Sequence, residues 1–254
     1  MTLNRTPLSC LTYNIHKGMS ANNREYLLPR MRDAIRATDA DIVAIQEIVG
    51  EHSGLSKKHQ DWHTQAHFEY LADSVWCEFA YGKNAIYQQG HHGNALLSKY
   101  PFLSQANHDI TQWRFSQRGL LHGVIHLEGT THKRVHVACI HLGFLPFEQW
   151  RQIRKVVHWL KQQPQDDPLI LMGDFNDWHL RIHKHLTLDV GLQEVSQYMG
   201  RHPFSTFPAN SPTLPLDRIY YRGLKLDHSE VLAGEDWSQL SDHRPIFAKF
   251  LLEI

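Results

Sequence analysis

The sequence predicts an α/β protein, a four-layer α-β-β-α sandwich of two mixed, largely antiparallel sheets. Apolar, β-branched segments alternate with segments that have helical spacing in both halves of the chain. Several strands also follow one another through turns too short for a crossover helix, which fits a purely parallel sheet less well. No low-complexity linker, charge block or short repeat divides the 254 residues, so we expect a single domain over 1–254.

The first half is expected to supply two strand–helix alternations and a further strand pair. Residues 8–15 are apolar enough for a buried strand, and residues 24–38 carry Leu27, Leu28, Met31 and Ile35 at helical spacing. Residues 49–64 are polar and predict a long loop that contains Trp62. The remaining elements expected in this half are a strand at 41–46, a short helix at 68–75, and strands at 94–98 and 102–108.

The second half is expected to begin with a hairpin and continue with a helix. Residues 119–127 and 133–142 would pair across a turn at 128–131. Pro146 suits the first turn of a helix that places Trp150, Ile153, Val157 and Leu160 on one face. The strands expected after this helix are 169–172, 216–221, 224–231 and 245–252.

The composition narrows the classes of partner. Lys and Arg number 26, as do Asp and Glu, so the formal charge is zero, whereas proteins that bind long nucleic acid nonspecifically carry a basic surplus. No apolar run reaches the roughly 18 residues of a membrane span, and no basic-then-apolar leader opens the chain, so we expect a cytoplasmic protein. Cys10 and Cys139 fall in strands and are expected to be reduced core residues. Most of the 20 histidines fall in loops without a zinc-ligand pattern and are expected at the surface.

Polar side chains stand where four expected strands begin or end. Asn14 stands at the end of the first strand and Glu47 follows the second, while Asp174 and Asn176 follow Leu169–Met172. Asp242 and His243 precede the last strand. Strand ends are where α/β proteins place ligand chemistry, and carboxylates with carboxamides are ligands for a hard cation. The sequence therefore predicts a hard-cation site suited to phosphoryl chemistry.

The chain resembles the endonuclease/exonuclease/phosphatase superfamily, whose members include deoxyribonuclease I, exonuclease III and neutral sphingomyelinases, and it is similar to compact bacterial members. The segments that carry the resemblance occur in the superfamily's order: Thr12-Tyr13-Asn14-Ile15, Gln46-Glu47, Gly93-Asn94-Ala95-Leu96-Leu97-Ser98, Arg118-Gly119, His141-Leu142, Gly173-Asp174-Phe175-Asn176, Leu216-Asp217-Arg218-Ile219 and Ser241-Asp242-His243-Arg244-Pro245. The resemblance implies the fold and site geometry of that superfamily.

The resemblance also implies a role for each metal and phosphate ligand. Glu47 would be the main ligand of Mg²⁺, or of Mn²⁺ as an alternative, with Asn14 and Asp242 beside it. Asn94 and Arg118 would contact the phosphate of the substrate.

The implied catalytic residues are five. Asp174 would position or deprotonate the attacking water, and Asn176, two residues on in extended backbone, would project to the same side and hold the reaction centre. His243 would stabilise the phosphorus centre with its tautomer fixed by Asp217, and His141 would contact the scissile phosphate.

The expected activity is metal-dependent hydrolysis of a phosphoester by in-line attack of water. The neutral charge and the aromatic loop residues, Trp62 and those of 107–117 among them, favour a small-molecule or lipid head-group phosphodiester. A DNA or RNA endonuclease or exonuclease is the alternative, and nucleic acid stays open as a substrate. A noncatalytic binding protein that kept the fold is a second alternative, although such proteins typically lose a metal ligand or the terminal histidine. No obligate protein partner is evident in the sequence.

Overall fold

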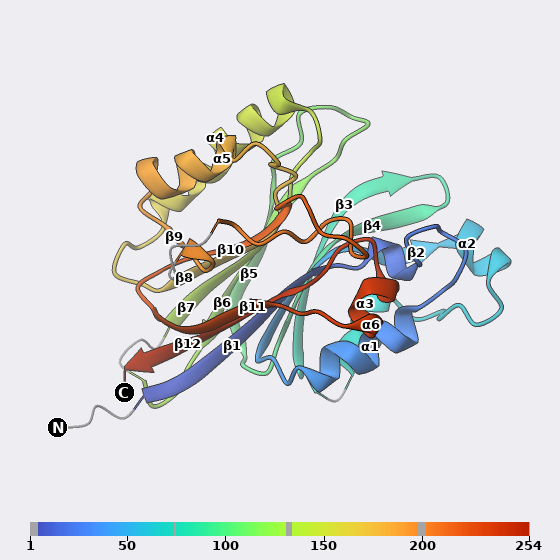
Figure 1. The fold of residues 1–254 in the computed structure, drawn as a ribbon, viewed down its shortest axis with the longest axis horizontal. Coiled ribbons are helices and arrows are strands. Elements are labelled where there is room, and N and C mark those ends of the chain that lie inside the picture. The colour runs from blue at the N-terminus through green and yellow to red at the C-terminus, as the bar shows by residue number, and fades with distance from the viewer. Residues whose placement is uncertain (1–4, 74, 131–133, 198–201, 254) are drawn as a thin grey trace.

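A computed structural model describes residues 5–73, 75–130, 134–197 and 202–253. The described residues form two six-stranded sheets, and helices cover their outer faces (Figure 1). The first sheet has the strand order β11-β12-β1-β2-β4-β3 and the second has the order β5-β6-β7-β8-β10-β9. Both sheets mix parallel and antiparallel pairs: β1 runs parallel to β2, and β7 parallel to β8. The four-layer α-β-β-α sandwich expected from the sequence is confirmed.

The strands of the first sheet are β1 (Arg5–Asn14), β2 (Ile42–His52), β3 (Glu78–Tyr87), β4 (Gly90–Ser98), β11 (Lys225–Val231) and β12 (Ile246–Glu253). Those of the second are β5 (Phe102–Asp109), β6 (Gly119–His126), β7 (Arg134–His141), β8 (Leu169–Asp174), β9 (Gln193–Glu194) and β10 (Asp217–Arg222). The helices are η1 (His16–Gly18), α1 (Leu28–Ala37), α2 (Ser53–Lys58), α3 (His67–Ala72), α4 (Pro146–Gln162), α5 (Arg181–Lys184), η2 (His185–Asp189) and α6 (Glu235–Leu240).

The central core lies between the two sheets and follows the two-residue period of the strands. Leu8 and Cys10 of β1 point to the second sheet, where Val137 and Cys139 of β7 face them, and all four are fully buried. The next residue, Leu11, points to the opposite face and packs with helix α1. Both cysteines are free and buried, as the sequence predicts.

Each outer face is covered by helices with one apolar stripe. Met31 and Ile35 of α1 are fully buried against the first sheet, and Ile153 and Val156 of α4 are buried against the second. Trp150, which the sequence places on the buried face of α4, is instead 45% exposed. Ile153 and Leu160 are buried as expected, Val156 is buried beside them, and Val157 packs against the same cluster while partly buried.

Two local predictions from the first half are wrong. Residues 49–64 are not one loop, because β2 continues to His52 and α2 follows directly. Helix α1 begins at Leu28 rather than near residue 24, because Tyr26 forms a bridge with Met19 and Pro29 enters the first turn. The expected turn at 128–131 lies partly outside the described residues, but β6 and β7 pair antiparallel as predicted.

Candidate active site

The strands bring their polar ends to one edge of the sandwich. Asp174 ends β8 and pairs in register with His141 of β7 and with Asp217, which begins the antiparallel strand β10. Gly173 precedes Asp174 with φ +144°, and any Cβ there would clash with the carbonyl oxygen of Ile140. Glycine is therefore required for β8 to approach β7 this closely beside the site.

Asp174 is the centre of this cluster. Its Oδ2 accepts a hydrogen bond from Asn14 Nδ2 at 3.0 Å and lies 3.5 Å from His141 Nε2 and 3.9 Å from His243 Nε2. Burial raises the pKa of Asp174 to about 7, while the nearby His243 opposes this shift. A carboxyl group in this setting exchanges a proton near neutral pH.

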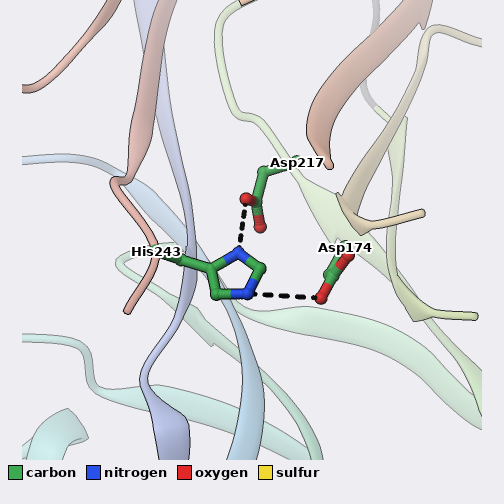
Figure 2. A group of neighbouring side chains, drawn as sticks. All are labelled: Asp174, Asp217 and His243. Atoms are coloured by element: carbon green, nitrogen blue, oxygen red, sulfur yellow. Dashed lines mark hydrogen bonds and ion pairs between the residues drawn. The ribbon is translucent and has the colours of Figure 1, made fainter. Parts of the chain in front are cut away.

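His243 is held from its other side by Asp217. The His243 Nδ1 atom lies 2.7 Å from Asp217 Oδ2, and Asp174 lies beyond Nε2, as Figure 2 shows. Thr206 Oγ1 donates to the same Asp217 oxygen at 2.6 Å. Burial alone lowers the pKa of His243, but Asp217 and then Asp174 raise it to about 10. The ring therefore carries a positive charge at neutral pH.

Two further acidic residues of the site belong to the first sheet, Glu47 within β2 and Asp242 in the segment before β12. Glu47 Oε2 accepts from Lys17 Nζ at 2.7 Å, and Asp242 Oδ2 lies 3.1 Å from His16 Nδ1. Burial raises the pKa of Glu47, but Lys17 together with His141 and His16 outweighs burial and holds this pKa below its usual value. Burial likewise raises the pKa of Asp242, but the hydrogen bond from His16 and the charge of His243 together bring this pKa below its usual value. The carboxyl groups of Glu47 and Asp242 are therefore both negatively charged at neutral pH.

Glu47 does not end its strand, contrary to the expectation from the sequence. It has φ +56° at a register shift between Ile45 and Ile48, and β2 resumes beyond it. A non-glycine residue in this region of φ/ψ space is costly and is held by its surroundings. The bulge points the Glu47 side chain in a direction that the alternation of a regular strand would not give it.

Asn176 also departs from the expected extended backbone. Its φ is +49°, and its backbone N–H donates to Asp174 Oδ1 at 2.9 Å, so the chain turns directly after β8. Its Nδ2 donates to the carbonyl of Leu142 at 2.9 Å, which ties this turn to the end of β7. Gln149 of α4 donates to the carbonyl of Asn176 at 2.7 Å and fixes the turn from the other side.

The two expected phosphate contacts differ in what surrounds them. Asn94 is buried, and its Nδ2 donates to the carbonyls of Gly119 (3.0 Å) and Cys139 (3.4 Å), which is a bond between the two sheets. Arg118 is partly exposed and donates to the carbonyl of its neighbour Gln117 (3.1 Å), while its Nε is buried without a hydrogen-bond partner.

Burial lowers the pKa of His141 far below its usual value, and Arg118 adds to this shift. His141 is therefore neutral.

Two sets of side chains among the described residues carry atoms that could bind a cation. Asp174, Asp217 and His243 each offer a ligand atom within 4.8 Å of the others. However, Asp217 Oδ2 and His243 Nδ1 already share a 2.7 Å hydrogen bond, which a metal held by these atoms would break. Glu47 and Asp242 are oxygen donors of the kind that Mg²⁺ prefers, and each already faces a positive group of the protein. The residues at Glu47 therefore fit a hard divalent cation.

Sequence reasoning missed the residues that support the site. His16 and Lys17 directly follow the segment Thr12-Tyr13-Asn14-Ile15, but the sequence pattern indicates a role for neither. Buried Arg218, next to Asp217, forms an ion pair with buried Asp177 at 3.1 Å between Nη1 and Oδ2. An arginine in the middle of an apolar strand segment is the signal that could have indicated this pair.

Comparison with known proteins agrees with this geometry. The family model described as "Endonuclease/Exonuclease/phosphatase family" matches residues 11–243. The chain belongs to this family. This family member is 40% identical over 242 residues to YbhP of Escherichia coli (strain K12), with 95% of each chain covered.

Solved structures share the fold of this family member at low sequence identity. An endonuclease/exonuclease/phosphatase from Beutenbergia cavernae superposes with a TM-score of 0.77 at 17% identity, covering 98% of this chain and 72% of that one. TDP2 of D. rerio, solved with a single-strand DNA product, superposes with a TM-score of 0.73 at 19% identity, covering 96% and 99%. No helix in the described parts of the chain is both long and apolar enough to cross a membrane.

Proposed function

We propose that the protein is a divalent-metal-dependent phosphodiesterase that acts by in-line attack of water on a small or lipid-type substrate. The observation that carries this proposal is the aligned set Asp217–His243–Asp174, which places a charged imidazole beside a carboxyl group that titrates near neutrality. This pair can supply both a proton acceptor for water and a positive donor for the phosphate.

Glu47 is proposed as the main metal ligand, with Asp242 and Asn14 beside it. The Asn14 side chain is shared, since its Nδ2 binds Asp174 and its Oδ1 accepts from the His16 N–H at 3.1 Å. A Mg²⁺ ion there would neutralise negative charge on the phosphate oxygens. Lys17 lies 2.7 Å from Glu47 and must move aside or share this carboxylate when the ion binds.

The chain's own residues perform the remaining steps. Asp174 orients the attacking water and accepts a proton from it. The Asn14 amide and the Asn176 N–H fix the direction of the two Asp174 carboxylate oxygens. His243 donates from Nε2 to the developing negative charge while Asp217 keeps the ring charged and oriented. Neutral His141 and Arg118 complete the contacts to the phosphate, and Asn176 supports the turn that holds Asp174. Asn94 is left with a structural role.

A nuclease is the second candidate, and one observation favours it: TDP2, which shares this fold, has been solved with a single-strand DNA product. The zero formal charge of this chain argues against extensive binding of phosphate backbones.

The deciding experiment is a substrate screen with Mg²⁺ or Mn²⁺ against bis-p-nitrophenyl phosphate, sphingomyelin, cardiolipin and plasmid DNA. We expect hydrolysis of a small or lipid diester, with an apparent affinity for the soluble diester that changes little between about 50 and 200 mM salt. Efficient DNA cleavage that salt reduces about a thousandfold, and that Asp174→Ala abolishes, would replace this substrate class with nucleic acid. The absence of hydrolysis of every phosphoester would refute the enzymatic function.

A further inference from the structure

An unusual set of large apolar side chains is exposed next to the site. Its members come from the β5–β6 loop and from the start of α4, and we call them the aromatic face: Trp113, Phe115, Phe144, Leu145, Phe147 and Trp150. Phe115 is 81% exposed, and Phe144 is 58% exposed. A cluster of this kind on a protein surface marks an interaction site.

The two segments of the aromatic face lie together. Lys155 of α4 donates to the carbonyl of Thr111 at 3.3 Å, which fastens the β5–β6 loop to the helix. Within each segment the rings stack in pairs: Trp113 with Phe115 at 6.1 Å and Phe147 with Trp150 at 6.5 Å between centroids. In Figure 1 the green β5–β6 loop rises at the top of the molecule beside the yellow-green start of α4.

The aromatic face adjoins the edge of the sandwich that carries Asp174 and His141. His141 ends β7, and Phe144 follows it by three residues. Gln149 of α4 donates to the carbonyls of Gly143 (2.9 Å) and Asn176 (2.7 Å), so the base of the aromatic face and the turn after Asp174 share one hydrogen-bonded support. Anything that covers this face is therefore held beside the phosphate-binding residues.

Within residues 111–118 and 144–158 every exposed charged side chain is basic, while the acidic Asp189 of η2 lines one hollow with Trp150 and Arg154. Arg114, Arg151, Arg154 and Lys155 are exposed within residues 111–118 and 144–158. The one acidic residue of these two segments, Glu148, is buried and accepts from Gln152 Nε2 at 3.0 Å. The face thus combines apolar side chains at loop tips with a basic rim, although the chain as a whole is neutral.

We propose that the aromatic face docks the protein onto the surface of an anionic lipid bilayer. Aromatic and leucine side chains insert at the boundary of head groups and acyl chains, and neighbouring Arg and Lys residues bind anionic head groups. Docking in this way would present a lipid phosphodiester to the edge that carries Asp174 and His243. That the bilayer also holds the substrate rests on the proposed function.

Single-stranded nucleic acid fits the same face less well. Binding of bases needs ring faces that are free for stacking. The Arg151 guanidinium lies 4.4 Å from the centroid of Phe147, and that of Arg154 lies 4.8 Å from the centroid of Trp150. These two rings also stack on each other, so little of their faces is left for a base.

The test is cosedimentation of the whole protein with vesicles of phosphatidylcholine alone or with about 30% phosphatidylglycerol. We expect binding to the anionic vesicles, with a blue shift of tryptophan fluorescence. The triple variant Phe115→Ser/Phe144→Ser/Phe147→Ser should lose at least tenfold in partition coefficient. The double variant Arg114→Gln/Arg154→Gln should lose about twentyfold on anionic vesicles only. Both variants should hydrolyse a soluble diester as the wild type does.

The matched controls are Leu103→Ser, which is 53% exposed on β5, and Lys225→Gln on β11. Neither should change vesicle binding, and the site variant Asp174→Asn should bind vesicles as the wild type does. Failure of the wild type to bind anionic vesicles, or equal losses in the controls, would overturn the docking surface and leave the hydrolase intact. Binding of an oligothymidylate that the triple variant loses, without vesicle binding, would overturn it in favour of nucleic acid. Vesicle binding without any diester hydrolysis would keep the surface and refute the proposed function.

Discussion

Asp217 and His243 come from different sheets and meet through a 2.7 Å hydrogen bond between Oδ2 and Nδ1. Asp217 begins β10 of the second sheet, whereas His243 lies in the segment that leads into β12 of the first. The phenyl ring of Phe207 packs over the imidazole at 5.0 Å between centroids. The bond therefore joins the two sheets at the edge that carries the candidate site and aims Nε2 at Asp174.

Replacing the two members of this pair should have unequal effects. His243→Ala should reduce turnover by roughly a hundredfold or more, because the charged donor to the phosphate is lost. Asp217→Asn should reduce it less, since the ring remains but is less well oriented and less charged. Steady-state kinetics on a soluble diester measure both. A neutral Asp217→Asn beside an inactive His243→Ala would show that the pairing does not serve catalysis.

The sequence was sufficient to predict the layers and the edge where the site lies. Strands β1, β8 and β12 are apolar, and each begins or ends next to polar residues. A pattern of this kind can be recognised in the sequence whatever fold buries the strand. Asp174 and Asp217 became neighbours because β10 runs antiparallel to β8.

The direction of individual side chains could not be predicted from the pattern. The left-handed backbone of Glu47 and Asn176 depends on contacts with other strands, and neither residue type requires it. The same holds for Lys17, whose ion pair with Glu47 arises only because η1 follows β1 directly beside β2. Histidines are equally ambiguous: most were expected at the surface, but His67 is only 1% exposed.

Glu47→Gln should keep the fold and abolish most divalent-dependent hydrolysis. A neutral amide binds a hard cation poorly, so we expect a loss of at least a hundredfold in activity and in Mg²⁺ affinity. Titration calorimetry with Mg²⁺ in the absence of substrate measures the affinity directly. Glu51→Gln, an exposed change in the same strand, is the control and should bind the ion normally. Unchanged Mg²⁺ binding by Glu47→Gln would assign the ion to other ligands.

Asp177→Asn should destabilise the protein strongly without touching the reacting groups. Asp177 and Arg218 are both buried, and Asp177 also accepts from the N–H groups of Arg181 and Ile182 at the start of α5. Removing one partner leaves a buried charge uncompensated, which costs about 3–5 kcal/mol. Urea unfolding measures this loss. Asp177→Asn/Arg218→Met should recover a large part of it, and a double variant as unstable as the single one would contradict the argument.

The buried His67 should make stability fall on the acid side of neutrality. Its ring packs 4.5 Å from that of Trp62, and its Nε2 lies 3.3 Å from the hydroxyl of Tyr26. Burial lowers its pKa to about 3, while an unfolded chain has the ordinary value of about 6.5. Between these values the unfolded chain binds a proton that the folded protein does not. The contribution of neutral His67 to the free energy of unfolding is therefore fully present above pH 6.5 and is lost as the pH falls towards 3.

At pH 5 the cost from His67 is about 2 kcal/mol, from a difference of about 1.5 pH units at 1.36 kcal/mol each. Urea unfolding of the wild type at pH 7 and pH 5 should show at least this loss. His67→Phe fills the same apolar site without a titratable group, so its loss between the two pH values should be smaller by about 2 kcal/mol. His179→Phe, at an exposed position, should leave the wild-type difference unchanged. If His67→Phe retained the full pH dependence, the acid sensitivity would have to come from other buried histidines, such as His122, whose pKa burial lowers to about 4.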